Sequence, residues 1–164
     1  MKYVNWIFVV LFVSSLTSFV EKDKPVMGLN VGDVAPNFKI QPTLGEQPFE
    51  LRKLKGKYVL LSFWASYDAP SRMRNVQLNN KLQDVTSDVE LVSVSFDEYE
   101  SIFNETIRKD QITSPTCFVE TEGESSTVFK AYHLNKGFDN YLLNENGTII
   151  AKNVPASDLI NYLD

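Results

Sequence analysis

The sequence predicts an α/β fold in three layers, in which a central mixed sheet has helices on both faces and an N-terminal β-hairpin beside it. The nearly continuous apolar run 58–64 is rich in β-branched and aromatic residues, as a strand buried on both faces requires, and 90–96 is expected to form a second buried strand. A segment with helical spacing of apolar residues separates them, which indicates a parallel strand–helix–strand unit. The turn sequence 144–147 lies between two short apolar segments and predicts an antiparallel hairpin. A parallel half joined to an antiparallel half gives a mixed sheet.

The remaining elements follow from shorter patterns. Apolar residues that alternate on both sides of a turn-rich stretch predict a hairpin over 31–51. The other expected strands span 116–119, 140–143 and 148–151, and the expected helices span 66–85, 98–109, 125–132 and 157–163. Asp97 and Ser157 precede two of these helices. They are candidate N-caps, because their side-chain oxygens can accept a hydrogen bond from a free N–H of the first turn.

The length and the N-terminus predict an exported protein with one domain. The chain has 164 residues, 43% of them apolar, which is enough for a single core. Residues 1–20 contain one positive residue, Lys2, then the apolar run 6–13 and a small polar run, which together describe a secretory signal peptide. The alternative is an uncleaved N-terminal membrane anchor. A linker is expected over 21–30 and the domain over 31–164, in the periplasm or cell envelope.

Charge and residue counts exclude several classes of partner and site. The formal net charge is −5, which argues against nucleic acid or anionic lipid as the main partner. Membrane contact is expected only through residues 1–20, if they remain attached. The chain has one cysteine and one histidine, so it can form no internal disulfide and no cysteine–histidine zinc cluster. No metal and no cofactor are expected.

Four stretches, 31–38, 55–66, 94–98 and 141–149, follow one another in the order found in a known family. They resemble its opening G-x-x-A-P-x-F motif, the strand that leads into its active site, its second core strand and its closing hairpin. The family is that of the TlpA/ResA-like thiol–disulfide oxidoreductases of the AhpC/TSA redoxin type, which are exported bacterial proteins. The resemblance covers residues 29–163 and implies a thioredoxin-like fold.

The sequence departs from this family at the residues that carry its chemistry. In the family the strand ends in a W-C-x-P-C motif; here Asp68 stands in place of the first cysteine and Ser71 in place of the second. A carboxylate forms no disulfide, and an unactivated hydroxyl does not attack one at neutral pH. Phe138 stands where the family has a cis-proline, and a cis bond before any other residue costs about 2.5–4 kcal/mol, so a trans bond is expected. These departures imply no dithiol exchange and no catalytic residue.

The start of the helix expected at 66–85 has two interpretations. Asp68 suits an N-cap and Pro70 suits the first turn, which gives both residues a structural role. Alternatively, Asp68 and Ser71 contact a ligand on the surface with which relatives hold their substrates. The candidate binding residues are Trp64, Tyr67, Asp68, Pro70, Ser71, Arg72, Phe138 and Asp139. A protein, peptide or small ligand is expected there if the three aromatic side chains are exposed together; otherwise Trp64 belongs to the core.

Cys117 and His133 offer the alternative functions. Cys117 lies in the strand expected at 116–119 and is interpreted as a small buried apolar residue. The competing hypothesis is a thiol-based oxidoreductase or antioxidant activity through this lone thiol, which needs an exposed thiol in an electropositive niche. His133 is interpreted as a surface histidine. The first hypothesis is therefore a non-catalytic binding protein, the second a thiol enzyme, and the third a structural subunit of an assembly.

Overall fold

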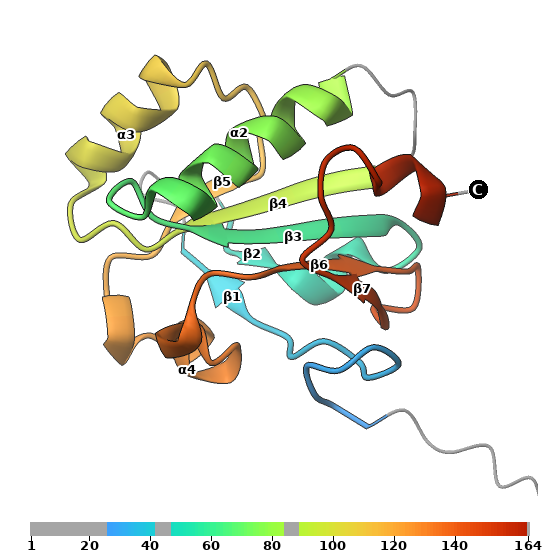
Figure 1. Cartoon of the computed structure of the whole chain (residues 1–164). Coiled ribbons are helices and arrows are strands. Elements are labelled where there is room, and N and C mark those ends of the chain that lie inside the picture. Colours follow the sequence, from blue (N-terminus) through green and yellow to red (C-terminus); the bar gives the residue numbers. More distant parts are fainter. Residues whose placement is uncertain (1–25, 42–46, 84–88, 164) are drawn as a thin grey trace, which may run out of the picture.

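The computed structural model describes residues 26–41, 47–83 and 89–163 (Figure 1). The expected signal segment, 1–20, and the first half of the expected linker lie outside the described residues. Within the described ranges, no helix is long and apolar enough to cross a membrane.

A five-stranded mixed sheet forms the centre of the domain, as the sequence predicts. Its strands run in the order β5-β4-β3-β6-β7. Their bounds are β3 Tyr58–Trp64, β4 Val89–Ser95, β5 Cys117–Val119, β6 Asn140–Leu143 and β7 Ile149–Lys152. Strand β3 pairs in parallel with β4 and antiparallel with β6, which makes it the central strand and explains its continuous apolar sequence. A separate hairpin of β1 (Lys39–Ile40) and β2 (Phe49–Glu50) confirms the expected N-terminal hairpin, with shorter strands than its 31–51 span.

Helices cover both faces of the sheet (Figure 1). The long helices α2 (Ala69–Gln83) and α3 (Glu100–Lys109) lie on one face, and the short helix α4 (Thr127–Ala131) lies on the other. Four short 3₁₀ helices complete the described part: η1 Leu51–Leu54, η2 Gly123–Ser125, η3 Leu134–Lys136 and η4 Leu159–Tyr162.

The expected helix at 157–163 and its cap are wrong in detail. The segment forms only the 3₁₀ helix η4, whose N-cap position is Asp158, and no side chain caps it. Ser157 instead donates its hydroxyl to the side chain of Asp158 at 2.8 Å. A segment of this length gains few i→i−4 hydrogen bonds for the residues it must fix, so the tighter helix is favoured.

The two faces of the sheet differ in chemistry. On the α4 face, alternate residues of β3, among them Leu61 and Phe63, join a large apolar cluster that includes Val128. On the α2 face the apolar cluster is smaller and centres on Leu60 and Leu78. Buried polar side chains share that second face or its edge: Ser62, Ser71, Asn75, Asn79, Ser93, Ser95, Asp97 and Asn140. The side of the sheet under α2 is therefore held by hydrogen bonds as well as by apolar contact.

Residues 26–30, which precede the expected start of the domain at residue 31, also contact the folded domain. Leu29 packs against the large apolar cluster, and the N–H of Gly28 donates to the carbonyl of Val34 at 3.1 Å. The last part of the expected linker, residues 26–30, therefore lies against the domain in the structure.

Candidate functional site

The start of α2 places Asp68 and Ser71 in direct contact. The N–H of Ser71 donates to Oδ1 of Asp68 at 2.9 Å, and the hydroxyl of Ser71 donates to the carbonyl of Asp68 at 3.1 Å. The hydroxyl and the N–H of Ser71 both lower the pKa of Asp68. Asp68 is thus the N-cap of α2, as the sequence predicts, and Pro70 occupies the first turn. Ser71 is buried, so its hydroxyl faces the protein.

The loop between β3 and α2 is fixed by a buried carboxylate. Oδ1 of Asp97 accepts hydrogen bonds from the N–H of Ser66 at 2.9 Å and from its hydroxyl at 2.5 Å. The hydroxyl of Ser95 donates to Oδ2 at 2.6 Å. The prediction that Asp97 caps the second helix is wrong, because Tyr99 occupies the N-cap position of α3. The carboxylate turns inward to three donors, and it positions the loop that presents Tyr67. Asp97 comes two residues after the end of β4 at Ser95, and this position beside a buried strand is a signal that could have indicated the role.

Trp64 belongs to the core and not to an exposed aromatic cluster. Its side chain is 1% exposed, and its Nε1 donates to the hydroxyl of Ser93 at 2.8 Å. That hydroxyl donates in turn to Oδ1 of Asn75 at 2.8 Å. The ring also lies 6.2 Å from the ring of Phe103 in α3. Trp64 faces α2, because alternate residues of a strand point to the same side and Leu60 of β3 also faces α2. Trp64 is therefore not available as a binding residue on the surface.

Tyr67 and Phe138 do meet at the surface. Their ring centroids are 6.5 Å apart in an edge-on arrangement, and Tyr67 is 73% exposed. Phe138 is half-buried and stacks on Phe96 at 5.9 Å, which anchors the pair to the core. The peptide bond before Phe138 is trans, as expected.

The loop that carries Phe138 and Asp139 is held by α2 and by the end of β7. Arg74 donates a hydrogen bond to the carbonyl of Phe138. Asn153 donates its amide to the carboxylate of Asp139 at 2.8 Å, and the N–H of Phe63 donates to the carbonyl of Asp139 at 3.2 Å. Sequence reasoning missed Arg74 and Asn153, which offer no local motif. The carbonyl of Phe138 is consequently engaged within the chain.

Arg72 joins α2 to the end of α3. Its Nε and Nη2 donate to the two carboxylate oxygens of Asp110, each at 2.6 Å, and this pairing raises the pKa of the Arg72 guanidinium. An open hollow of about 430 Å³ lies beside it, between Ser66 and the α3 residues Ile102 and Thr106. The candidate site therefore has the Tyr67–Phe138 pair on one side and this hollow on the other.

Cys117 lies apart from this site, on β5. It pairs in register with Ser93 of β4, so a whole strand separates it from β3. Burial raises the pKa of the Cys117 thiol to about 11, an increase that a hydrogen bond with Ser93 partly opposes. His133 is exposed, as expected. Among the described residues, no group of three or more His, Cys, Asp or Glu side chains is arranged to hold a metal ion.

Comparison with known proteins identifies the family. The model of the AhpC/TSA family matches residues 31–152, which is most of the chain. This chain belongs to the AhpC/TSA family. Proteins similar to it include the thiol-disulfide oxidoreductase ResA of Bacillus subtilis (strain 168), which is 27% identical over 123 residues. That match covers 74% of this chain but only 66% of ResA, so the chain spans slightly less than two thirds of that relative.

Solved structures show the same fold. A thioredoxin-like protein from Parabacteroides distasonis ATCC 8503 superposes with a TM-score of 0.74 and 42% identity, covering 85% of this chain and 98% of that one. A thiol-disulfide oxidoreductase from Bacteroides fragilis NCTC 9343 superposes with a TM-score of 0.66 and 26% identity, covering 80% and 97%. The expected thioredoxin-like fold is therefore confirmed for this AhpC/TSA member.

Proposed function

We propose that this chain is a member of the AhpC/TSA family without dithiol chemistry, and that it binds an extended polypeptide at the start of α2. The observation that carries the proposal is the contact between Asp68 and Ser71, the two residues that stand in place of the family's cysteines. Disulfide exchange needs a thiolate at the first position and a second thiol to resolve the mixed disulfide. With Asp68 and Ser71 at these positions, the chain has neither the attacking thiolate nor the resolving thiol.

The hydrogen bond between Asp68 and Ser71 also supports a structural role for these two residues at the start of α2. In a thiol enzyme the free N–H groups at the start of this helix stabilise a thiolate. Here the Asp68 carboxylate takes that place and accepts the N–H of Ser71. One free N–H of the helix start is therefore satisfied within the chain, and we expect a partner to contact the side chains around it.

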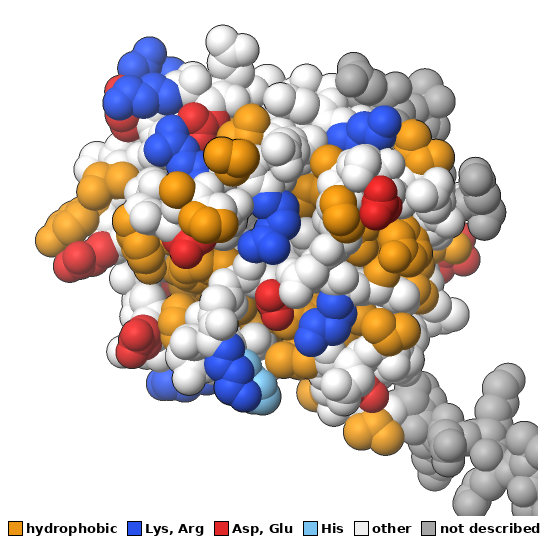
Figure 2. Space-filling model, viewed as in Figure 1, with side chains coloured by type: hydrophobic (Ala, Val, Ile, Leu, Met, Phe, Trp, Pro, Cys, Tyr) orange, Lys and Arg blue, Asp and Glu red, His pale blue; other side chains and the backbone are white. Residues whose placement is uncertain are grey.

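Exposed apolar side chains surround this helix start and support a polypeptide partner. They are Tyr67, Met73, Tyr99 and Ile102, which we call the apolar rim. Figure 2 shows hydrophobic side chains along the edge where α2 and α3 begin. Apolar patches bordered by polar groups are typical of protein interaction surfaces, where tyrosine and methionine are enriched. Because Arg74 engages the carbonyl of Phe138, side-chain contacts rather than strand pairing at that carbonyl would supply the affinity.

The proposed location is the periplasm or cell envelope. This rests on the signal-peptide pattern of residues 1–20 and on the resemblance to exported oxidoreductases. The competing hypothesis of a thiol enzyme through Cys117 receives no support from a pKa of about 11, because the thiolate is then scarce at neutral pH.

An insulin-disulfide reduction assay tests the absence of dithiol chemistry. We expect no turnover by the natural chain or by Cys117→Ser, and a gain of turnover in the double variant Asp68→Cys/Ser71→Cys. Turnover by the natural chain that Cys117→Ser abolishes would overturn the proposal and make Cys117 the reacting thiol.

Binding of an unfolded polypeptide tests the partner class. The probe is reduced and alkylated α-lactalbumin, which offers extended chain without thiols. We expect saturable binding that Tyr67→Ser and Tyr99→Ser each weaken at least about tenfold, as for aromatic contacts at an interface centre. The matched control is Tyr162→Ser, since Tyr162 is also exposed but lies on η4, away from the apolar rim. Equal loss of binding in all three variants, or no binding by the natural chain, would reject this surface.

A further inference from the structure

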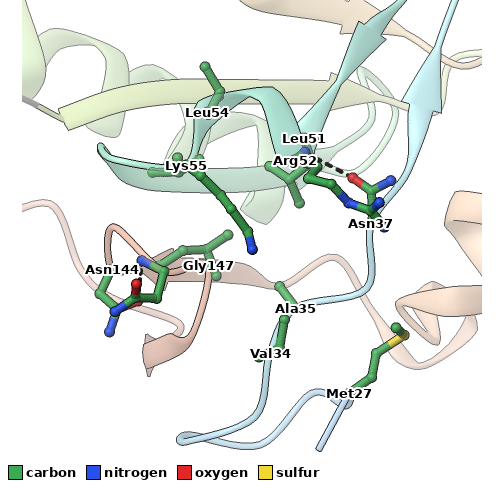
Figure 3. A pocket seen from close by; sticks show the side chains of 13 residues that line it. Met27, Val34, Ala35, Asn37, Leu51, Arg52, Leu54, Lys55, Asn144 and Gly147 are labelled. Atoms are coloured by element: carbon green, nitrogen blue, oxygen red, sulfur yellow. Dashed lines mark hydrogen bonds between the residues drawn. The ribbon is translucent and has the colours of Figure 1, made fainter. Parts of the chain in front are cut away.

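A second hollow lies at the other end of the sheet from the start of α2. It has a volume of about 280 Å³ and is bounded by the N-terminal segment, η1 and the turn between β6 and β7 (Figure 3). Val59 lines it, and Trp64 lies five residues further along β3, about 17 Å away at 3.4 Å per residue. The hollow is therefore separate from the apolar rim.

The floor of the hollow is apolar and rigid. Leu51, Val59 and Leu143 line it together with Ala35, and all four belong to the large buried cluster of the α4 face. Leu54 lines it from the end of η1 and packs against the same cluster. Close-packed side chains of this kind keep their rotamers, so the floor exists before any ligand binds.

Backbone hydrogen bonds hold the walls in place. The N–H of Ala35 donates to the carbonyl of Gly147 at 3.0 Å, which joins the N-terminal segment to the β6–β7 turn. The N–H of Gly56 donates to the carbonyl of Glu145 at 2.8 Å, which joins the residues after η1 to the same turn. Gly56 has a φ of +95°, a conformation that favours glycine, and it fixes the direction in which the chain leaves η1. The segments that form the walls of the hollow are thus joined to one another by main-chain hydrogen bonds.

The charged side chains that line the hollow are both cationic. Lys55 extends from the end of η1 into the space in front of the turn, and Arg52 lies one turn earlier (Figure 3). Among the described lining residues there is no Asp or Glu. These two residues belong to the stretch 52–57, which contains four of the chain's 16 basic residues although the whole chain carries a net charge of −5. A local positive field over an apolar floor suits an anion with an apolar body.

We propose that this hollow binds a small monocarboxylate with an apolar chain, such as a medium-chain fatty acid. Lys55 would receive the carboxylate, because charge-assisted hydrogen bonds to carboxylates are the strong ones, and Arg52 would add positive charge at the side of the hollow. The alkyl chain would lie on Leu51, Val59 and Leu143 and lose its contact with water. The volume of about 280 Å³ corresponds to about nine non-hydrogen atoms at the ~30 Å³ that a water occupies in the liquid, close to the size of octanoate.

Titration of the full chain with octanoate, followed by amide NMR shifts, tests the proposal. We expect saturable shifts in residues of the hollow with a Kd of about 0.1 mM, a value in the range for a ligand of this size. The neutral analogue 1-octanol should bind at least about tenfold more weakly, since it lacks the charge that Lys55 recognises. The lack of saturable shifts up to about 10 mM octanoate would overturn the proposal.

Two lysine variants separate recognition of the carboxylate from general attraction. Lys55→Gln should weaken octanoate binding about fivefold to tenfold. Lys53→Gln, two residues earlier on η1 but outside the lining, should leave it unchanged. Both side chains are exposed, so both variants should fold. Equal weakening by the two variants, or equal affinity for octanoate and 1-octanol, would reject the carboxylate site. Tyr67→Ser should leave octanoate binding unchanged, so failure here and failure of polypeptide binding are distinguishable.

Discussion

The carboxylate of Asp68 accepts a hydrogen bond of 2.9 Å from the N–H of Ser71, which joins the residue before α2 to the third residue of the helix. The contact satisfies one free donor at the start of α2, and it places a negative charge at the positive end of the helix dipole. Both effects stabilise α2 without any ligand. Under the function proposed above, this contact keeps the start of the helix in place without a dithiol.

Replacing Asp68 by alanine should lower the free energy of unfolding by about 1 kcal/mol, the usual effect of losing an N-cap. Asp68→Asn should cost much less, because asparagine caps helices equally well but has no charge. Urea unfolding at neutral pH measures both variants. Equal losses in the two would show that the charge, and not the cap hydrogen bond, dominates at this position.

The same pair of variants should show a defined pH dependence. The folded protein lowers the pKa of Asp68 below the model-peptide value of 3.8, so the ionised form favours folding. The stabilisation is therefore complete above that value and is lost as the pH falls through the folded-state pKa. The stability difference between the natural chain and Asp68→Asn should shift against the natural chain when unfolding is repeated near pH 3. A constant difference would mean that the Asp68 pKa is unchanged on folding.

Ser62 and Ser93 are register partners on β3 and β4, yet their alanine variants should differ in stability. Ser93→Ala removes the acceptor of the Trp64 Nε1–H and should cost about 1–3 kcal/mol, the effect of a buried unsatisfied donor. The hydroxyl of Ser62 is buried without a hydrogen-bond partner among the described residues, so Ser62→Ala should be neutral or slightly stabilising. Urea unfolding followed by Trp64 fluorescence compares the two. Similar losses in both variants would contradict the assigned hydrogen bonds.

The thiol of Cys117 should react slowly. A pKa of about 11 leaves far less thiolate at neutral pH than a free cysteine has, so alkylation by iodoacetamide should be about 100-fold slower than in the chain unfolded by urea. The rate should rise with pH until about 11. A rate at neutral pH equal to that of the unfolded chain would place a reactive thiolate at Cys117 and revive the thiol hypothesis.

The paired charges of Arg72 and Asp110 should stabilise the contact between α2 and α3. Their side chains are 34% and 14% exposed, so a double-mutant cycle with Arg72→Gln and Asp110→Asn should give a coupling of about 1 kcal/mol. The control cycle is Arg108→Gln with Glu105→Gln, whose side chains are 72% and 48% exposed, and it should give at most about 0.5 kcal/mol. Equal couplings would mean that the Arg72 contact is no stronger than an ordinary surface pair.

The sequence by itself determined the strands of the sheet, the two long helices that cover one of its faces, and the N-cap of α2. The apolar run 58–64 is the strand β3 with the same bounds, and Asp68 caps the helix that it precedes. These features depend on the period of side chains along one element or on a few neighbouring residues, so they are visible without the fold. The same local reasoning failed for Asp97 and Ser157, because a candidate N-cap can also turn to other hydrogen-bond partners.

Only the tertiary structure decided which side chains reach the surface and which contacts build the two hollows. Trp64 is buried under α2, where its Nε1–H finds the hydroxyl of a serine 29 residues away, and Arg74 reaches the carbonyl of Phe138 across 64 residues. The cavity beside Lys55 exists because the N-terminal segment, η1 and the β6–β7 turn converge at one end of the sheet. Such contacts depend on strand order and register, which are set by the packing of the whole chain and have no local pattern in the sequence.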